Sequence, residues 1–166
     1  MASICSSPPE IQLMILNYCD FFSLLQMRQV SKYCKLLADH SLLHQCHLHV
    51  VCDYLAKFLN YKHPSFALSD QRKDYDLVFN KIFEFINFYM PNLQDLSLRN
   101  CPVILTVAGL IQLASAAPNL YRLDLSQTCC NKPFFEADAI LALRYFRQLK
   151  VLVMDGFVLQ KASRKG

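Results

Sequence analysis

A short motif that recurs in the C-terminal half constrains the fold of this chain more than any other feature. Two copies read Pro-Asn-Leu-x-x-Leu-x-Leu, at 91–98 and 118–125, and a third keeps Leu-x-x-Leu-x-Met at 149–154. The first leucines of the three copies are separated by 27 and then 29 residues. Neighbouring side chains of a strand point to opposite faces, so the leucines are expected to point inward and the residues between them outward.

Apolar residues at helical spacing precede each copy of the motif. These stripes are Phe79, Ile82, Phe83 and Ile86; then Leu110, Leu113 and Ala114; then Ala139, Leu143 and Phe146. A helix that returns the chain between strands leaves each unit with exposed apolar surface until a neighbouring unit stacks on it. The spacing therefore predicts an α/β repeat fold over 76–159, with parallel strands and outer helices.

The N-terminal part, 7–46, has the pattern of three short helices. Ser7 followed by two prolines and a glutamate indicates a helix start, and a similar signal begins at Ser23. Ile11, Ile15 and Tyr18 follow at a spacing that gives the first helix one apolar face. Isolated helices of this length are marginal in water, so we expect the module to lean on a neighbouring domain or a partner.

Two further segments complete the predicted organisation. Residues 47–75 are interpreted as a linker or a degenerate first repeat, and 160–166 as a basic polar tail. Twelve residues follow Met154, so the strand at 151–154 is expected to be a bare edge. A partner or the tail would have to cover that edge, unless the chain is a shortened form of a longer array.

Composition argues against several classes of function. The net charge of +4 is mild and the basic residues are scattered, so no nucleic-acid partner is expected. No apolar run approaches the ~18 residues of a membrane span, and the N-terminus lacks a secretory pattern. We therefore expect no membrane contact, a cytoplasmic and/or nuclear location, and eight reduced cysteines.

Neither catalysis nor metal binding is expected. The chain has no His-Glu-x-x-His, Gly-x-Ser-x-Gly or Gly-x-x-x-x-Gly-Lys motif, so we predict no enzyme activity and no cofactor. One cluster has residue types that suit zinc: His44, Cys46, His47, His49 and Cys52. Its spacing matches no compact zinc finger, and on a strand its members would face opposite sides, so we predict no metal site.

The repeats resemble the leucine-rich-repeat family in its cysteine-containing subtype. Cys101 stands where that subtype carries asparagine or cysteine after the strand, whereas Thr128 and Phe157 occupy the position in the later copies. The resemblance implies a short solenoid with parallel strands on its concave side.

The N-terminal part resembles the F-box motif, without gaps, over 7–46. The matching residues are Pro8, Glu10, Ile11, Leu13, Ile15, Leu16, Tyr18, Asp20, Leu24, Leu25, Val30, Lys32, Leu37, Ala38 and Leu43. The chain departs from the family at Ser7, where leucine is usual, and at Cys34 and His44, where tryptophan is usual. These departures remove contact area that could serve adaptor binding.

Together the two resemblances imply a substrate-recognition subunit of a ubiquitin ligase. F-box proteins dock on the Skp-type adaptor of a cullin–RING ligase, while their repeats hold a protein substrate and raise its effective concentration. The expected adaptor-binding residues are Pro8, Ile11, Ile15, Leu16, Leu24, Leu25, Val30 and Lys32. The expected substrate-binding residues are Asp95, Ser97, Arg99, Arg122, Asp124, Ser126, Val151, Val153 and Asp155. Two alternatives remain: a repeat interaction protein outside ubiquitin transfer, and a decoy that binds the adaptor but no substrate.

Overall fold

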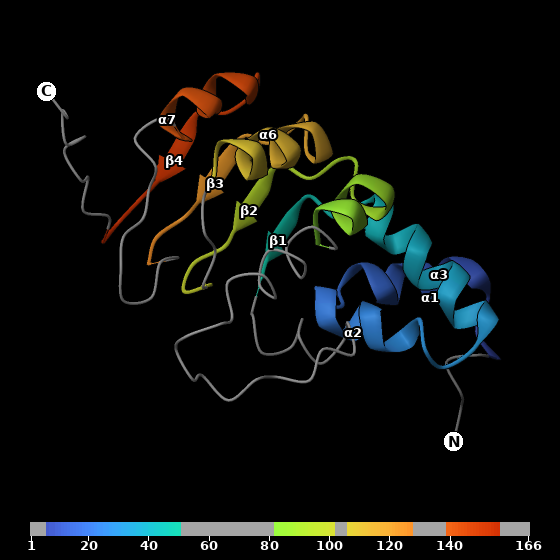
Figure 1. Ribbon diagram of the computed structural model, residues 1–166. Helices are drawn as coiled ribbons and strands as arrows, with labels where there is room; N and C mark the ends of the chain where they lie inside the picture. The colour runs from blue at the N-terminus through green and yellow to red at the C-terminus, as the bar shows by residue number, and fades with distance from the viewer. Residues whose placement is uncertain (1–5, 51–81, 102–105, 128–138, 157–166) are drawn as a thin grey trace, which may run out of the picture.

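The protein consists of an N-terminal group of helices followed by a two-layer α/β region. The computed structural model describes residues 6–50, 82–101, 106–127 and 139–156. The first three helices are α1 (Pro9–Asn17), α2 (Phe21–Met27) and α3 (Lys32–Leu43). Figure 1 shows that they lie at one end of the molecule, beside the first strand of the sheet. The predictions for Cys52, Phe79, Thr128, Phe157 and the basic tail fall on segments outside the described residues.

In the part of the chain that the structure describes, four parallel strands form the sheet, in the order in which they occur in the chain. They are β1 (His47–His49), β2 (Asp95–Ser97), β3 (Arg122–Asp124) and β4 (Val151–Val153). The last three strands lie at the predicted motifs, and their pairing keeps the motifs in one register. The first strand lies in the segment interpreted as a linker or a degenerate first repeat, and it continues the same register.

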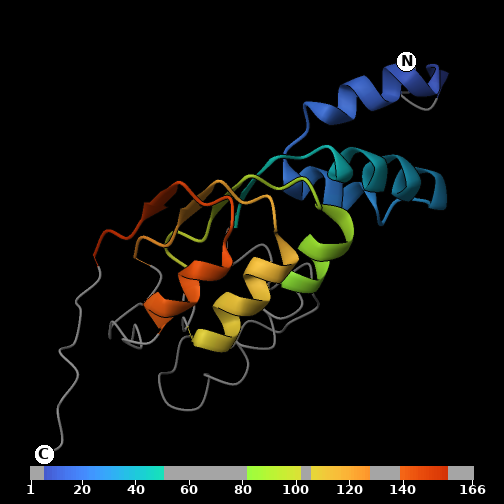
Figure 2. The same cartoon turned by 90° about the horizontal axis from the view of Figure 1, so that it is seen from above.

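Helices cover one face of this sheet, as Figure 2 shows. They are the helix at 82–89, α6 (Val107–Ala116), and α7 (Ala139–Ala142), which continues as the 3₁₀ turn η2 (Leu143–Tyr145). Thr106 caps α6 by accepting a hydrogen bond from the backbone N–H of Gly109 at 3.0 Å. The predicted helical stripes are buried where the structure describes them, except Leu143, which is half-buried.

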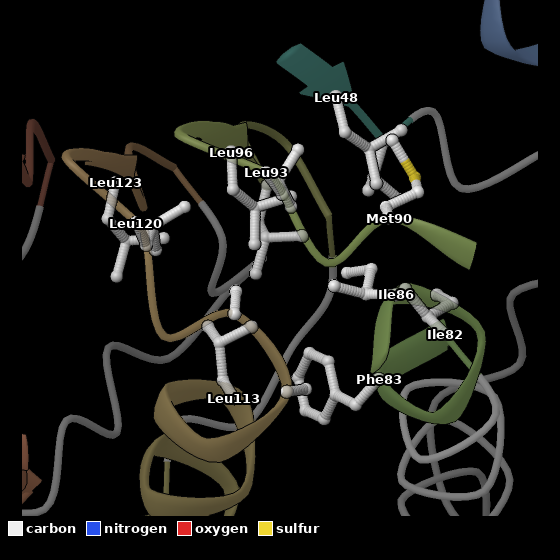
Figure 3. Close-up of a cluster of buried hydrophobic side chains, with 14 of the residues drawn as sticks. Leu48, Ile82, Phe83, Ile86, Met90, Leu93, Leu96, Leu113, Leu120 and Leu123 are labelled. Atoms are coloured by element: carbon white, nitrogen blue, oxygen red, sulfur yellow. The ribbon is translucent and has the colours of Figure 1, made fainter. Parts of the chain in front are cut away.

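The core lies between the sheet and its helical layer. In Figure 3, Leu48, Leu96 and Leu123 project from three neighbouring strands toward Phe83 and Leu113 of the helices. Successive strand residues alternate in direction, so this leucine row is buried while the residues beside it are exposed or half-buried, except Asp124, which is buried. The inward direction predicted for the motif leucines is confirmed for β2 and β3.

The turns before the strands repeat the same hydrogen bond. Asn92 of the first motif donates its side-chain amide to the carbonyl of Leu43 at 3.0 Å. Asn119 of the second motif donates in the same way to the carbonyl of Pro91 at 3.1 Å. Each asparagine therefore joins its strand to the preceding turn, and the first of these bonds reaches the C-terminal end of α3.

The turns after the strands also share one backbone conformation. Asn100, Gln127 and Gly156 follow β2, β3 and β4 at equivalent positions and have φ values of 60°, 55° and 83°. This left-handed region costs little for glycine and is tolerated by asparagine, whereas glutamine adopts it rarely. The same chain path is therefore imposed on three different residue types.

The helix starts differ from the sequence expectation in two places. Helix α1 begins at Pro9 with Pro8 as its N-cap, and no side-chain hydrogen bond caps it, so Ser7 lies before the helix start that its sequence signal indicates and does not cap it. Helix α2 begins two residues before Ser23, because Asp20 is in extended backbone conformation and accepts the N–H of Ser23 at 2.9 Å. The start signal of α2 is therefore Asp20 followed by two phenylalanines, and not Ser23.

The last strand differs from the others in the burial of its central leucine. Leu96 and Leu123 are fully buried, whereas Leu152 at the same register position is 37 % exposed. Among the described residues the sheet ends at β4, so no further strand covers the outer side of Leu152.

The leucine row provides a matched pair of substitutions that tests this packing. We expect Leu96→Ala to lower the free energy of unfolding by about 2–5 kcal/mol, because it empties a fully buried site. The same change at Leu152 should cost about 1 kcal/mol or less, since part of that side chain already contacts water. Urea unfolding followed by far-UV circular dichroism measures both. Equal losses would contradict the assignment of β4 as the uncovered edge.

Candidate partner-binding surfaces

Helix α1 turns most of its apolar side chains toward solvent. Ile11, Met14, Ile15 and Tyr18 recur at helical spacing, and all four are exposed. The sequence correctly places three of them on one face, but that face is not the one that packs on the protein's own core. It forms an apolar strip, called here the α1 strip, on the surface of the helical region.

The orientation of α1 follows from an unusual buried residue. Gln12 and Leu16 are the buried residues of this helix, and they lie one turn apart. The side-chain carbonyl of Gln12 accepts a hydrogen bond from the hydroxyl of Tyr33 on α3 at 2.9 Å, and its amide donates to the carbonyl of Ser7. A buried amide with both ends satisfied costs little, so α1 can dock through a polar residue and keep its aliphatic residues outside.

The predicted adaptor-binding residues divide into two groups. Five are exposed: Pro8, Ile11, Ile15, Val30 and Lys32. Three are buried in the core: Leu16, Leu24 and Leu25. The buried leucines hold the three helices together, so a partner can reach only the first group directly.

Further exposed apolar residues on α1 and α3 were not among the predicted adaptor-binding residues. They are Met14 on α1 and Tyr33, Leu36 and Leu43 on α3. Met14 could have been found from its spacing of three residues from Ile11. The exposed side of α3 gave no such signal, because apolar residues occur on several sides of that helix.

An ionic row crosses the solvent-facing side of the sheet. The pairing register aligns His47, Asp95 and Arg122 on three adjacent strands. The carboxylate of Asp95 lies 3.6 Å from Nδ1 of His47 and 3.7 Å from Nε of Arg122. Sequence reasoning included Asp95 and Arg122 but not His47, whose place depends on the unpredicted pairing of β1 with β2.

Two predicted substrate-binding residues are used inside the protein. Asp124 is buried and accepts the backbone N–H of Ser126 at 2.9 Å. Ser126 is also buried, and its hydroxyl accepts the backbone N–H of Asp155 at 3.2 Å. These contacts tie the turn after β3 to the turn after β4, so both side chains stabilise the sheet rather than project from it.

The remaining predicted positions reach solvent to different degrees. Arg99 and Asp155 are exposed, whereas Asp95, Ser97, Arg122, Val151 and Val153 are half-buried. The sheet therefore presents charged and polar groups on β2 and β3 and two valines on β4.

The environment of Asp124 shifts its ionisation. Burial raises the pKa of this carboxyl. Hydrogen bonds from the backbone and side chain of Ser126 and the charges of Arg99 and Arg122 lower the pKa, and together they outweigh burial. The net effect is a pKa below the ordinary value of 3.8. The ionised form is therefore the one that the fold favours.

The structure brings together no metal site in the part of the chain that it describes. No group of three histidine, cysteine, aspartate or glutamate side chains is placed to hold an ion there. Cys46 instead lies with its sulfur 3.6 Å from the carbonyl of His44. Within the described ranges, no helix combines the length and apolar content needed to cross a bilayer.

Replacement of Asp124 provides a pH-dependent test of its role. We expect Asp124→Asn to lower the free energy of unfolding at neutral pH by roughly 1–3 kcal/mol, through loss of charge-assisted hydrogen bonds. The wild-type advantage is fully present above pH 3.8, the ordinary value, and is lost as pH falls through the lower folded pKa. Urea unfolding at several pH values measures it. Asp155→Asn, at an exposed position, is the control and should have little effect; a pH-independent loss at Asp124 would contradict the assignment.

Comparison with known proteins assigns the helical region. Comparison with curated proteins finds no match to this chain. The family model of the F-box domain matches residues 8–46, which include α1, α2, α3 and the exposed α1 strip. The chain therefore contains an F-box domain at residues 8–46, a domain type that suggests a general adaptor role in ubiquitin ligases of the Skp/cullin/F-box class.

Proposed function

We propose that this protein is a substrate-recognition subunit of a Skp/cullin/F-box-type ubiquitin ligase. F-box domains typically bind Skp-type adaptors. The observation that carries the proposal is the α1 strip, where Ile11, Met14 and Ile15 lie exposed inside the segment that matches the F-box model. An apolar helix face without a partner in its own fold is suited to pack into a groove of another protein.

The proposed adaptor surface extends from α1 to α3. Ile11, Met14 and Ile15 supply aliphatic contact area, while Tyr33 and Leu36 add exposed apolar surface on the neighbouring helix. Such residues contribute to binding when a partner removes them from water. The surface could compensate for the missing family tryptophans, because Met14, Tyr33 and Leu36 provide area that Cys34 does not.

We propose that the α/β region is a short leucine-rich-repeat solenoid that holds the substrate. The support is the recurrence of one motif, one strand register and one left-handed turn residue in three successive units. Stacked units present a continuous row of outward side chains, which suits protein recognition. The residues available for this role are the exposed Arg99 and Asp155 and the half-buried Asp95, Ser97, Arg122, Val151 and Val153.

In this role the protein performs no chemistry itself. It brings a substrate near an enzyme that carries activated ubiquitin, so its contribution is a higher effective concentration of the reacting groups. Residence in the cytoplasm or nucleus is part of the proposal, since ubiquitin ligases of this class act there.

A decoy that binds the adaptor without a substrate is the second candidate. The observation that favours it is the small free surface of the sheet, where Asp124 and Ser126 are engaged in internal hydrogen bonds and Asp95 lies between the side chains of His47 and Arg122. Stable protein interfaces usually bury about 800 Å² on each partner, which is large for four strands of this length.

Adaptor binding is tested with a pair of substitutions matched in exposure and chemistry. Ile15 on α1 is 39 % exposed and Ile140 on α7 is 42 % exposed. We expect Ile15→Asp to abolish co-purification with a Skp-type adaptor, because it buries a charge in the proposed apolar contact. Ile140→Asp, far from the F-box domain in Figure 1, should leave co-purification unchanged.

Leu24 is unsuitable for this experiment, because it is fully buried and a charge there would unfold the helical region. Loss of adaptor binding in both isoleucine variants would point to a folding effect. Binding that survives in Ile15→Asp would remove the α1 strip from the interface, and a wild-type chain that does not bind would refute the proposed role.

Substrate capture is tested on the sheet. Charge reversal of Arg99 and Arg122 should remove chemical cross-links between the adaptor-bound chain and its protein substrates, since rim charges govern specificity and association rate. Arg144→Glu, on the helical side of the sheet, is the matched control. Mass spectrometry identifies the cross-linked proteins. If charge reversal at Arg99 and Arg122 leaves the set of cross-linked proteins unchanged, substrate binding by this face is contradicted and the decoy is favoured.

A further inference from the structure

Arg28 connects the F-box domain to the α/β region. It follows α2 directly as its C-cap residue, and its side chain is only 12 % exposed. Its Nε donates a hydrogen bond to the carboxylate of Asp39 on α3. The guanidinium carbon also lies 5.2 Å from the ring centre of Phe85 and 4.3 Å from that of Tyr89. Both aromatic residues belong to the helix at 82–89, which is part of the layer that covers the sheet.

Burial of the Arg28 guanidinium costs free energy and requires partners in a particular geometry. Withdrawing a guanidinium from water is costly unless its donors and its charge are compensated. Asp39 compensates the charge, and the two rings provide cation–π attraction that strengthens as water is excluded. A planar guanidinium can stack on an aromatic ring while it donates in its own plane, which a lysine ammonium cannot do.

The rings beneath Arg28 are themselves fixed. Phe85 and Tyr89 lie one helical turn apart, with ring centres separated by 4.6 Å. Phe21, the first residue of α2, packs edge-on against Phe85 at 5.8 Å. Residues at both ends of α2 therefore contact the same helix of the α/β region, so a change in the angle between the two regions would break contacts at both.

Backbone and side-chain hydrogen bonds also join the two regions near the chain connection. The carbonyl of Cys46 accepts the N–H groups of Gln94 and Asp95 at 2.8 and 2.9 Å. Asn92 bonds the carbonyl of Leu43, at the end of α3. These contacts fix where the two regions meet but lie near the chain connection, where they can act as a hinge. The Arg28 contacts instead join the end of α2 to the helix at 82–89.

We propose that Arg28 is a positioning residue that locks the angle between the F-box domain and the sheet. The inference deepens the proposed function and rests on it for its biological meaning: a fixed angle sets where a bound substrate stands relative to the adaptor. The lock itself is a property of the free chain and can be tested without any partner.

The angle is measured as a distance between two spin labels on the full chain. The labels are attached to p-acetylphenylalanine introduced at Lys35 on α3 and at Gln112 on α6, both exposed positions. This chemistry avoids the eight native cysteines. Pulsed electron–electron double resonance should give a single narrow distance distribution for the wild type. Arg28→Ala should broaden it or add a second population.

Two further variants separate locking from stability. Arg28→Lys keeps a positive charge near Asp39 but loses the planar stack, so it should also broaden the distribution while the fold survives. Arg144→Ala removes an arginine that lies 5.1 Å over Tyr145, remote from the junction, and should leave the distribution unchanged. Far-UV circular dichroism on each sample establishes that the chain is folded.

A narrow distribution at the wild-type distance in a folded Arg28→Ala or Arg28→Lys chain would overturn the proposal. Adaptor co-purification of the same variants is a separate readout, expected to match wild type because Arg28 faces the helix at 82–89. Failure of the wild type to bind the adaptor would refute the proposed function alone, whereas an unchanged distance distribution would refute the lock alone.

Discussion

Leu48, Leu96 and Leu123 occupy one register position in three adjacent parallel strands, and their side chains pack against the same helical layer. Each is buried by the strands beside it and by the helices beneath it. A register slip by one residue would turn these leucines to solvent and bring the charged residues beside them into the core. The ionic row, the turn contacts of Asp124 and the outward surface of the sheet all depend on this alignment.

Much of the α/β region could be predicted because its information is periodic. The motif spacing located β2, β3 and β4, and the alternation within the first two motifs gave the direction of their buried leucines. The strand β1 was harder to predict, because His47-Leu48-His49 lacks the Pro-Asn-Leu signal. Its segment was interpreted as a linker or a degenerate first repeat, and its pairing with β2 was not predicted. Burial of Asp124 and Ser126 could not be predicted from the sequence, because it depends on hydrogen bonds within and between the turns that follow the strands.

The helical region was predicted less completely, because its choice of inner face depends on packing between helices. Ile11, Ile15 and Tyr18 were correctly assigned to one face, yet Gln12 and Leu16 form the buried contact with α3. A buried glutamine is unfavourable unless its amide finds partners, and Tyr33, which provides one, is distant in sequence. The start of α2 differs from the prediction for a local reason, because Asp20 rather than Ser23 is the capping side chain.

The buried apolar residues form one continuous cluster that runs from Leu16 in α1 to Phe146 beneath β4. A chain with a single shared interior unfolds as one cooperative unit, so damage at one end is felt at the other. Substitutions that remove buried side chains beneath the sheet would therefore also unfold the F-box helices, although they change no residue of those helices. A loss of adaptor binding caused by such a change would report the stability of the whole chain, and only substitutions at its surface can map where partners make contact.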